Sequence, residues 1–376
     1  MKDVKIIANY LPQYHSIPEN DLWWGEGYTD WVAVKKSTPL YPGHIQPKVP
    51  MGENYYDLSR KENIQWQAEL AKAHNVFGFG IYHYWFSNEK MLLGKPAQII
   101  LENKDIDIHF MFIWDNGSWK RTWSKVKGFA NDWAPNFEGK SQDQTNGVLA
   151  ELVYGDEKDW RVHFDYLLPF FKDDRYIKLD GKPMFGFFNQ YNEPEVVARM
   201  CACWDKWAKE EGLPGICALG RRVVGKDSLL THQFDYDPHE HGWLRVSFVE
   251  KVINKLKKIT GLEGKHPQLF DYDTVWKRLL KEAEDCNDQS LFYGSFVDFD
   301  DSPRRGVKGK IMKGGTPEKF GNYLGKLIDI CRRQKKEYVF LTAWNEWGEG
   351  AYMEPDNRNG NRYLEALKQA TEKDLM

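Results

Sequence analysis

The sequence lacks three features that would complicate a reading of its fold. It has no apolar run of transmembrane length, no linker rich in proline, glycine and serine, and no internal repeat. The first absence argues against insertion into a membrane, because a spanning helix needs about 20 consecutive apolar residues. The other two argue against separate domains and repeat architectures. We therefore expect one domain over residues 1–376, a length that is normal for an α/β barrel with insertions.

Cysteine is scarce and charge is balanced. The five cysteines are odd in number and none has the CxxC spacing of a zinc site, so we expect free thiols in a reducing compartment. No signal peptide follows Met1, which predicts a cytoplasmic protein as written, although a secreted or periplasmic protein without its leader would look the same. The net charge of −3 gives no electrostatic reason to expect nucleic acid as a partner. The oligomeric state stays open.

Several catalytic motifs are also missing. No Walker loop, GxGxxG, GxSxG or HExxH pattern occurs, so nucleotide, NAD, serine-hydrolase and zincin chemistries lack their sequence signatures. The segment from Asp237 to His241 contains two histidines, but histidines separated by one residue cannot face one ion from a helix. We expect no metal and no other cofactor.

Short apolar runs alternate with helical patterns along the whole chain, which predicts an α/β fold, a (β/α)8 TIM barrel. Long connections after the first, third and sixth strands (Leu11–Arg60, Asp115–Asp159 and Asp237–Asp271) are expected over its C-terminal face. The candidate strands are Lys5–Tyr10, Phe77–Tyr82, Ile108–Trp114, Met184–Phe188, Ile216–Leu219, Gln233–Tyr236, Leu291–Val297 and Val339–Ala343. The candidate helices are Lys61–His74, Pro96–Asn103, Trp160–Lys172, Pro194–Glu211, Lys226–Leu230, Tyr272–Asp285, Pro317–Lys336 and Asn361–Lys373.

The most informative stretch is Leu341–Gly350, where an apolar strand ends in Asn-Glu-Trp-Gly-Glu. Residues three apart on a straight strand point to opposite faces, so Glu346 and Glu349 share a site only if the chain turns, which Gly348 and Gly350 allow. Paired carboxylates beside tryptophans suit the cleavage of glycosidic bonds. One acts as an acid, and apolar burial or the partner glutamate would raise its pKa. The alternative is two glutamates on a solvated loop.

Polar and aromatic residues also collect where the other strands end, which in barrel enzymes is the catalytic face. His83 could bind a sugar hydroxyl or be satisfied within a packed rim, and the tryptophans near Trp24 could bind ligand or pack over the barrel. Pyranose rings stack well on flat apolar surfaces, so we expect a carbohydrate ligand. The candidate substrate-binding residues are Tyr10, His15, Trp24, Tyr82, His83, Trp85, Trp114, Asp115, Asn116, Asn189, Tyr191, His239, Asn345, Trp347 and Glu354.

These motifs resemble the WbsX family of polysaccharide-locus proteins, which is also described as similar to glycoside hydrolase family 99. The resemblance covers nearly the whole chain. The motifs that carry it are Tyr10–His15, Trp23–Trp31, Gln46-Pro47, Tyr56–Leu58, Gly78–Phe86, Asp174–Ile177, Gly181–Pro183, Ala343–Gly350 and Glu354-Pro355.

Family 99 contains retaining endo-α-mannosidases on a (β/α)8 barrel, and the resemblance implies roles for both glutamates. Glu346 would draw the proton from the sugar 2-hydroxyl, and Glu349 would be the acid/base, with a 1,2-anhydro sugar between the two steps. The chain departs from these families at Asp115–Trp119, where an Asn-Glu-Asn sequence is usual, and at Gly348, where family 99 has histidine.

These departures leave mannose specificity open. We expect a glycoside hydrolase acting on an α-linked oligosaccharide or polysaccharide. The alternatives are a glycosyltransferase of O-antigen or capsule synthesis, which the WbsX name implies, and a non-catalytic carbohydrate-binding barrel.

Overall fold

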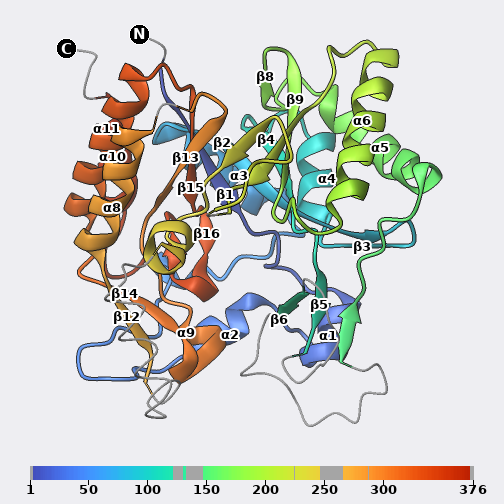
Figure 1. Cartoon of the computed structure of the whole chain (residues 1–376). Coiled ribbons are helices and arrows are strands. Elements are labelled where there is room, and N and C mark those ends of the chain that lie inside the picture. Colours follow the sequence, from blue (N-terminus) through green and yellow to red (C-terminus); the bar gives the residue numbers. More distant parts are fainter. Residues whose placement is uncertain are drawn as a thin grey trace.

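The computed structural model describes residues 3–121, 130–132, 147–223, 225–245, 266–286 and 288–372. Its centre is a closed barrel of eight parallel strands (Figure 1). In chain order they are β1 (Lys5–Tyr10), β2 (Val76–Ser87), β4 (His109–Trp114), β9 (Lys182–Phe187), β10 (Cys217–Arg221), β11 (His232–Phe234), β13 (Leu291–Phe296) and β15 (Tyr338–Thr342). Each strand pairs with the next, and β15 pairs with β1 to close the ring. The predicted TIM barrel and all eight of its strands are confirmed.

Strand β2 shows how the pleat distributes side chains between the barrel and the surrounding helices. It is buried along most of its length because helices cover its outer side. Successive side chains point to opposite sides of a strand. His83 and Trp85 point outward and pack on His163 of helix α5, so Tyr82 and Tyr84 point toward the barrel axis. This alternation decides which strand-end residues reach the site.

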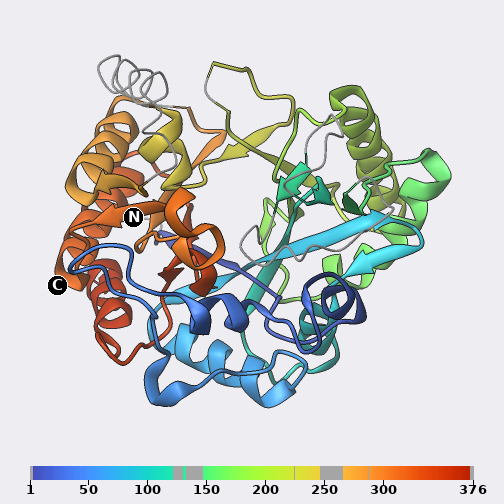
Figure 2. The same ribbon diagram turned by 90° about the horizontal axis from the view of Figure 1, so that it is seen from below.

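Helices surround the barrel on its outer side (Figure 2). They are α3 (Lys61–Ala73), α4 (Lys95–Glu102), α5 (Glu157–Phe171), α6 (Pro194–Glu210), α8 (Tyr272–Asp285), α10 (Pro317–Arg333) and α11 (Arg362–Glu372). Side-chain caps mark some starts: Asp271 accepts a hydrogen bond from the Thr274 amide, and Thr316 from the Lys319 amide. The expected last residue of the final helix, at 373, lies outside the described residues.

The predicted helix Lys226–Leu230 is wrong. The described residues between β10 and β11 contain turns and no helix. Five residues are too few to offset the cost of nucleating a helix. The hydroxyl of Ser228 also donates to the Leu230 carbonyl at 2.7 Å, which gives the backbone a local alternative to helical bonding.

The long connections gather at the carboxyl ends of the strands, below the barrel in Figure 1. Parts of the predicted third and sixth loops, residues 122–129, 133–146 and 246–265, lie outside the described residues. The short elements at this end are α1 (Pro18–Trp24), α2 (Asp30–Lys36), β5 (Ser118–Lys120), β6 (Ala130–Asp132), β7 (Val148–Ala150), η3 (His239–Leu244), β12 (Gln268–Asp271), α9 (Ser302–Arg305), β14 (Lys310–Lys313), β16 (Asn345–Glu346), η5 (Trp347–Glu349) and β17 (Ala351–Tyr352). Within the described ranges, no helix has the length and apolar character needed to cross a bilayer.

Candidate active site

Glu346 and Glu349 lie where the chain turns back after β15. Glu346 ends β16 and Glu349 ends the 3-10 helix η5, after which Gly350 adopts a left-handed conformation with φ of 58°. A 3-10 helix has three residues per turn, so residues three apart point to the same side. The two carboxylates therefore face one cavity, as the turn expected from the glycines requires.

A single buried arginine joins the two glutamates. Arg304 of α9 donates from Nη2 to Glu346 Oε2 and from Nη1 to Glu349 Oε1, both at 3.0 Å. The same guanidinium donates to both carboxylate oxygens of Asp30, at 3.0 and 2.9 Å. Charge-assisted, bidentate contacts of this kind fix geometry as well as adding stability. One cation thus sets the positions of three carboxylates.

Burial makes both glutamates weaker acids than exposed glutamates. Burial raises the pKa of Glu346 well above its usual range, and the charge of Glu349 raises it further, while Arg304 opposes both effects. Burial also raises the pKa of Glu349, again against the opposing effect of Arg304. Like charges this close resist joint ionisation. The pair therefore holds a proton at a pH where an exposed glutamate has lost it, which is what a general acid requires.

Asp30 also explains why position 348 is a glycine. A Cβ atom on Gly348 would lie 2.3 Å from Asp30 Oδ2 and 2.5 Å from Arg304 Nε, which is far inside normal contact distance. The Gly348 amide instead donates to Asp30 at 3.1 Å. The Asp30–Arg304 pair thus occupies the space beside the glutamate turn.

The N-terminal segment holds this turn in place. The side chain of Asn345 accepts from the Leu11 amide at 2.7 Å and donates to the Leu11 carbonyl at 3.0 Å. The hydroxyl of Tyr14 donates to the Asn345 carbonyl at 2.6 Å and accepts from the Trp347 amide at 3.1 Å. All three side chains are fully buried. Asn345 and Trp347 therefore support the glutamates from behind.

The glutamates open into a cavity of about 280 Å³ to which all eight barrel strands contribute. Its walls combine aromatic rings with charged groups, the usual make-up of a site that stacks a ring and orients it by polar contacts. The lining residues are Leu11, Gln13, Tyr82, Tyr84, Asp115, Trp119, Phe188, Arg221, Tyr236, His239, Asp301, Arg304, Arg305, Glu346 and Glu349. Larger hollows of about 430 and 610 Å³ lie elsewhere on the molecule, and neither contains a glutamate of the pair.

Five residues proposed from the sequence line this cavity: Tyr82, Asp115, His239, Glu346 and Glu349. The hydroxyl of Tyr82 is hydrogen-bonded to that of Tyr236 across the cavity wall at 3.0 Å. Burial lowers the pKa of His239 well below its usual range, so its ring is neutral at neutral pH. A neutral imidazole offers one donor and one acceptor, which suits a sugar hydroxyl.

Four others face the helical layer instead, and the expectation that they converge on the glutamates is wrong. The hydroxyl of Tyr10 donates to Gln67 of α3 at 2.7 Å. His83 is hydrogen-bonded to His163, Trp85 stacks on the same ring, and the Trp114 indole donates to the Trp85 carbonyl. Each lies one position out of phase with a cavity residue on its strand, and the pleat turns it outward.

The asparagines after the third and fourth strands are hydrogen-bonded to each other within the fold. Asn116 donates to the Asn189 carbonyl at 2.8 Å and accepts from the Asn189 amide at 2.8 Å. Tyr191 lies beyond them, where its hydroxyl donates to the Asp227 carbonyl at 2.6 Å. These three residues tie the ends of neighbouring connections together and do not line the cavity.

Three further candidates lie outside the cavity. Glu354 is behind Trp347, where it accepts hydrogen bonds from the indole, from Gln67 and from Tyr56 at 2.6 to 2.8 Å. His15 is buried on the loop after β1, and Trp24 lies 5.3 Å beneath the guanidinium of Arg121. The two rings and the Glu354 carboxylate thus belong to the support of the rim.

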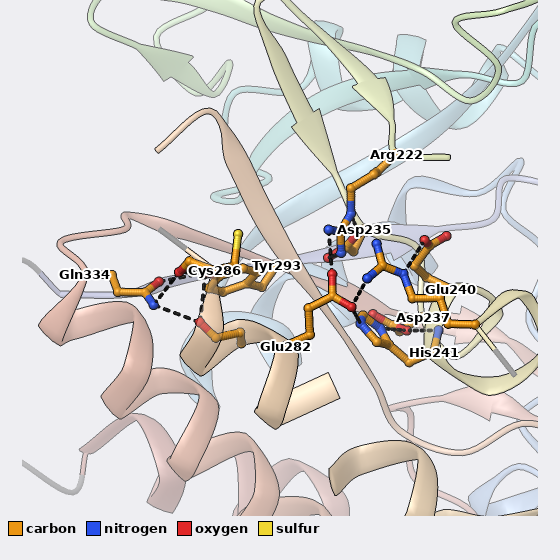
Figure 3. A network of polar contacts seen from close by, with 11 residues as sticks. Arg222, Asp235, Asp237, Glu240, His241, Glu282, Cys286, Tyr293 and Gln334 are labelled. Atoms are coloured by element: carbon orange, nitrogen blue, oxygen red, sulfur yellow. Dashed lines mark hydrogen bonds and ion pairs between the residues drawn. The ribbon is translucent and has the colours of Figure 1, made fainter. Parts of the chain in front are cut away.

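A polar network that includes His241 lies beside η3, the element that also carries His239 (Figure 3). Arg222 donates to both carboxylate oxygens of Asp235, at 2.5 and 2.7 Å, and to Glu282 of α8 at 2.7 Å. His241 lies 3.3 Å from the same Glu282. These contacts fasten η3 to β11 and α8, and η3 carries His239. The two histidines of this segment therefore face different surroundings, His241 toward α8 and His239 toward the cavity.

Sequence reasoning missed Arg304, Asp30 and Arg221. Arg304 and Arg221 lie at or just beyond strand ends, as the recognised candidates do, and the position of Arg221 on the inward phase of β10 was a usable signal. Arg304 follows Pro303 in the connection after the seventh strand, and proline beside aspartates is typical of an ordinary turn. No local pattern indicates that Asp30, 274 residues away, pairs with it.

One comparison of sequence identifies a family, and a second identifies individual relatives. The family model described as Glycosyltransferase WbsX matches residues 6–367. Two proteins named uncharacterized protein WxcX, from Xanthomonas campestris pv. campestris strains B100 and ATCC 33913, are each 28% identical over 378 residues. The match covers 97% of this chain and 49% of each relative. The chain thus spans about half the length of these relatives.

Solved structures share the fold of this chain. A family 99 endo-α-mannosidase from Bacteroides thetaiotaomicron, in complex with bis-tris-propane, superposes with a TM-score of 0.58 and 14% identity over 99% of this chain and 98% of that one. A protein described as glycoside hydrolase-like gives a TM-score of 0.57 and 13% identity over 99% of this chain and 94% of that one. Identities this low establish a shared fold.

Proposed function

The chain belongs to the family described as Glycosyltransferase WbsX, and from the geometry of its site we propose that it is nevertheless a glycoside hydrolase. It cleaves an α-linked, mannose-like glycan or polysaccharide with retention of configuration. The observation that carries the proposal is the pair of buried glutamates on one guanidinium, open to an aromatic cavity. The fold shared with family 99 endo-α-mannosidases supports the same chemistry.

The shared guanidinium favours retention. Retaining glycosidases hold their two carboxyl groups about 5–5.5 Å apart, whereas inverting enzymes leave about 6.5–9.5 Å for a water molecule. Glu346 and Glu349 each bond to a terminal nitrogen of Arg304 at 3.0 Å. Two acceptors on adjacent nitrogens of one planar group are held close together, which leaves little room for the water of an inverting enzyme, and in the route proposed below the sugar 2-hydroxyl is the nucleophile.

One oxygen of each carboxylate accepts a hydrogen bond from Arg304. The other oxygen of each can exchange a proton with the substrate. Oε2 of Glu349 is buried and accepts no hydrogen bond within the described part of the chain, so a proton placed there displaces no donor. Within the protein alone the pKa of Glu346 is raised more strongly than that of Glu349, so we place the proton on Glu349 for the complex in which the sugar 2-hydroxyl faces Glu346. Glu346 then stays ionised beside Arg304 and takes the proton of the sugar 2-hydroxyl.

The two steps balance as follows. The 2-oxygen attacks the anomeric carbon, its proton passes to Glu346, and the proton of Glu349 moves to the departing glycosidic oxygen. Glu349 then takes a proton from water, the hydroxide opens the 1,2-anhydro ring at the anomeric carbon, and Glu346 returns its proton to the 2-oxygen. Both glutamates regain their first protonation state.

Replacement of either glutamate by glutamine tests this assignment. Glu346→Gln and Glu349→Gln should each lower turnover on the order of 10²–10⁴-fold, the usual loss for an acid or base, while sugar affinity measured by calorimetry is largely kept. Glu365→Gln, on an exposed face of α11, is the matched control. A 2-deoxy substrate should resist the intact enzyme, and its ready hydrolysis would refute the anhydro-sugar route.

A glycosyltransferase is the second candidate, because the family description names that activity. Incubation with a panel of α-glycans, with and without nucleotide sugars, separates the two. Release of reducing sugar from a glycan alone supports the hydrolase. Product that forms only when a nucleotide sugar is present would favour the transferase instead.

A further inference from the structure

Arg221 is a cation in the cavity that has no anionic partner among the residues that the structure describes. Its guanidinium makes no hydrogen bond or ion pair with any residue that the structure describes, and its Nε is buried without an acceptor. The other two arginines of the cavity differ. Arg304 binds three carboxylates, and Nε of Arg305 lies 3.3 Å from Asp301.

The surroundings of Arg221 hold it in place for a ligand. Its guanidinium lies 4.7 Å from the ring centre of Phe188 and 5.2 Å from that of Tyr236. Stacking on aromatic faces is a common arrangement for arginine and leaves the N–H edge available for a planar acceptor. Burial lowers the pKa of Arg221, and the charges of Glu240 and Asp115 oppose this shift without forming an ion pair with the guanidinium.

The position of Arg221 in the barrel separates it from the glutamates. It ends β10, the fifth barrel strand, whereas the glutamates follow β15, the eighth, which is paired with the first. In this ring the fifth strand lies three places from the eighth, so Arg221 and the glutamates belong to different parts of the cavity wall. A sugar held between them therefore places its reacting carbon at one wall and a remote substituent at Arg221.

We propose that Arg221 binds a negatively charged substituent of the substrate, so that the glycan recognised here is acidic, a uronic acid or a sugar phosphate or sulfate ester. A carboxylate, phosphate or sulfate accepts two parallel hydrogen bonds from a guanidinium fork. This inference rests on the proposed function for the identity of the site as a sugar site, and it narrows the class of sugar.

Calorimetric titration of the full chain tests the proposal. Glucuronate, galacturonate and mannuronate are compared with the matching neutral hexoses, and hexose 6-phosphates and 6-sulfates form separate arms. At least one acidic sugar should bind about tenfold or more tightly than its neutral counterpart, the effect of a hydrogen bond to a charged group. The arm that binds best distinguishes the carboxylate from the esters.

Arg221→Met should reduce this preference to within about twofold, because the side chain keeps its bulk and loses its charge. Arg199→Met is the matched control: Arg199 also lies over a ring, that of Trp160 at 5.5 Å, but outside the cavity. Arg221→Lys should keep part of the preference, because it retains the charge without the fork. The melting temperature of each variant verifies folding.

Three results would overturn the proposal: equal affinity for acidic and neutral sugars, a preference that survives in Arg221→Met, or no binding of any acidic sugar at millimolar concentration. Tighter binding of UDP or GDP than of acidic sugars, lost in Arg221→Met, would also overturn it and assign the cation to a nucleotide sugar. None of these measurements needs cleavage. A protein that binds uronate through Arg221 and cleaves no glycan would refute the hydrolase and leave the subsite standing.

Discussion

Replacement of Gly348 by alanine tests whether the Asp30–Arg304 pair positions the glutamates. The new Cβ would lie 2.3 and 2.7 Å from the carboxylate oxygens of Asp30 and 2.5 Å from Arg304 Nε. Favourable contacts to carbon need about 3.5 Å, so these groups must retreat by roughly 1 Å. Glycine is not required here for its backbone conformation, because φ of Gly348 lies outside the left-handed range. The clash alone therefore accounts for the effect.

The expected magnitude has two parts. Overpacking a buried site costs about 1–3 kcal/mol, which denaturant unfolding measures as a lower free energy of unfolding. A retreat of roughly 1 Å stretches the 2.9 and 3.0 Å bonds from Arg304 to Asp30 beyond hydrogen-bonding range. Displacement of this size costs about 10²-fold in turnover, which initial rates of glycan hydrolysis measure.

Gly325→Ala is the matched control for this substitution. Gly325 lies inside α10, and the nearest atom to an added Cβ is that of Ala370 at 4.0 Å. Alanine is favoured over glycine within a helix by about 0.5–1 kcal/mol, so this variant should be as stable as the wild type or slightly more. If Gly348→Ala keeps the stability and turnover of the wild type, Asp30 and Arg304 do not set the geometry of the site.

Two further predictions concern buried charge. Arg304→Met leaves three carboxylates without their cation and should lower the free energy of unfolding at pH 7 by about 3–5 kcal/mol. The loss should be smaller at pH 5, where the two glutamates with raised pKa values take up protons. A loss under about 1 kcal/mol at pH 7 would contradict the shared-cation account. Burial raises the pKa of Glu354 to about 7, so the stability from its protonated form is fully present below the unfolded value near 4.3 and is lost as pH rises to 7. Wild-type stability should therefore fall by about 3 kcal/mol more than that of Glu354→Gln over this interval, and equal slopes in urea unfolding would rule this out.

The barrel was predictable because its signal is local. Each strand is a short apolar run, and burial on both faces makes such runs easy to recognise. The glutamate pair was predictable for a similar reason, since both residues lie in one turn after the eighth strand. The helix expected at 226–230 failed because five residues carry too little periodicity to outweigh local hydrogen bonding by Ser228.

The rest of the site was harder to predict, for two physical reasons. Nearness to a strand end does not decide whether a side chain points into the barrel or toward the helices. The pleat decides it, and it turns four candidates toward the helices: Tyr10, His83, Trp85 and Trp114. Contacts between distant loops leave no local pattern at all: the bond from Arg304 to Asp30 joins residues 274 positions apart. The pairing of a buried cation with acids from distant loops can be recognised only in the three-dimensional structure.

The arrangement of the cavity wall has a consequence for how this protein can diverge. The first sector of the wall consists of the glutamates after β15, Arg304 after β13 and Asp30 after β1, which supports them. The second sector consists of the aromatic rings and Arg221, which come from the part of the barrel between β2 and β11. Substitutions in the second sector leave the hydrogen bonds of the first untouched. We therefore expect related chains to exchange one sugar preference for another by single changes on β2 or β10, or just after β4 or β9. By contrast, Asp30, Glu346 and Glu349 all bond to Arg304. We therefore expect that none of these four residues can be replaced without disturbing the other three.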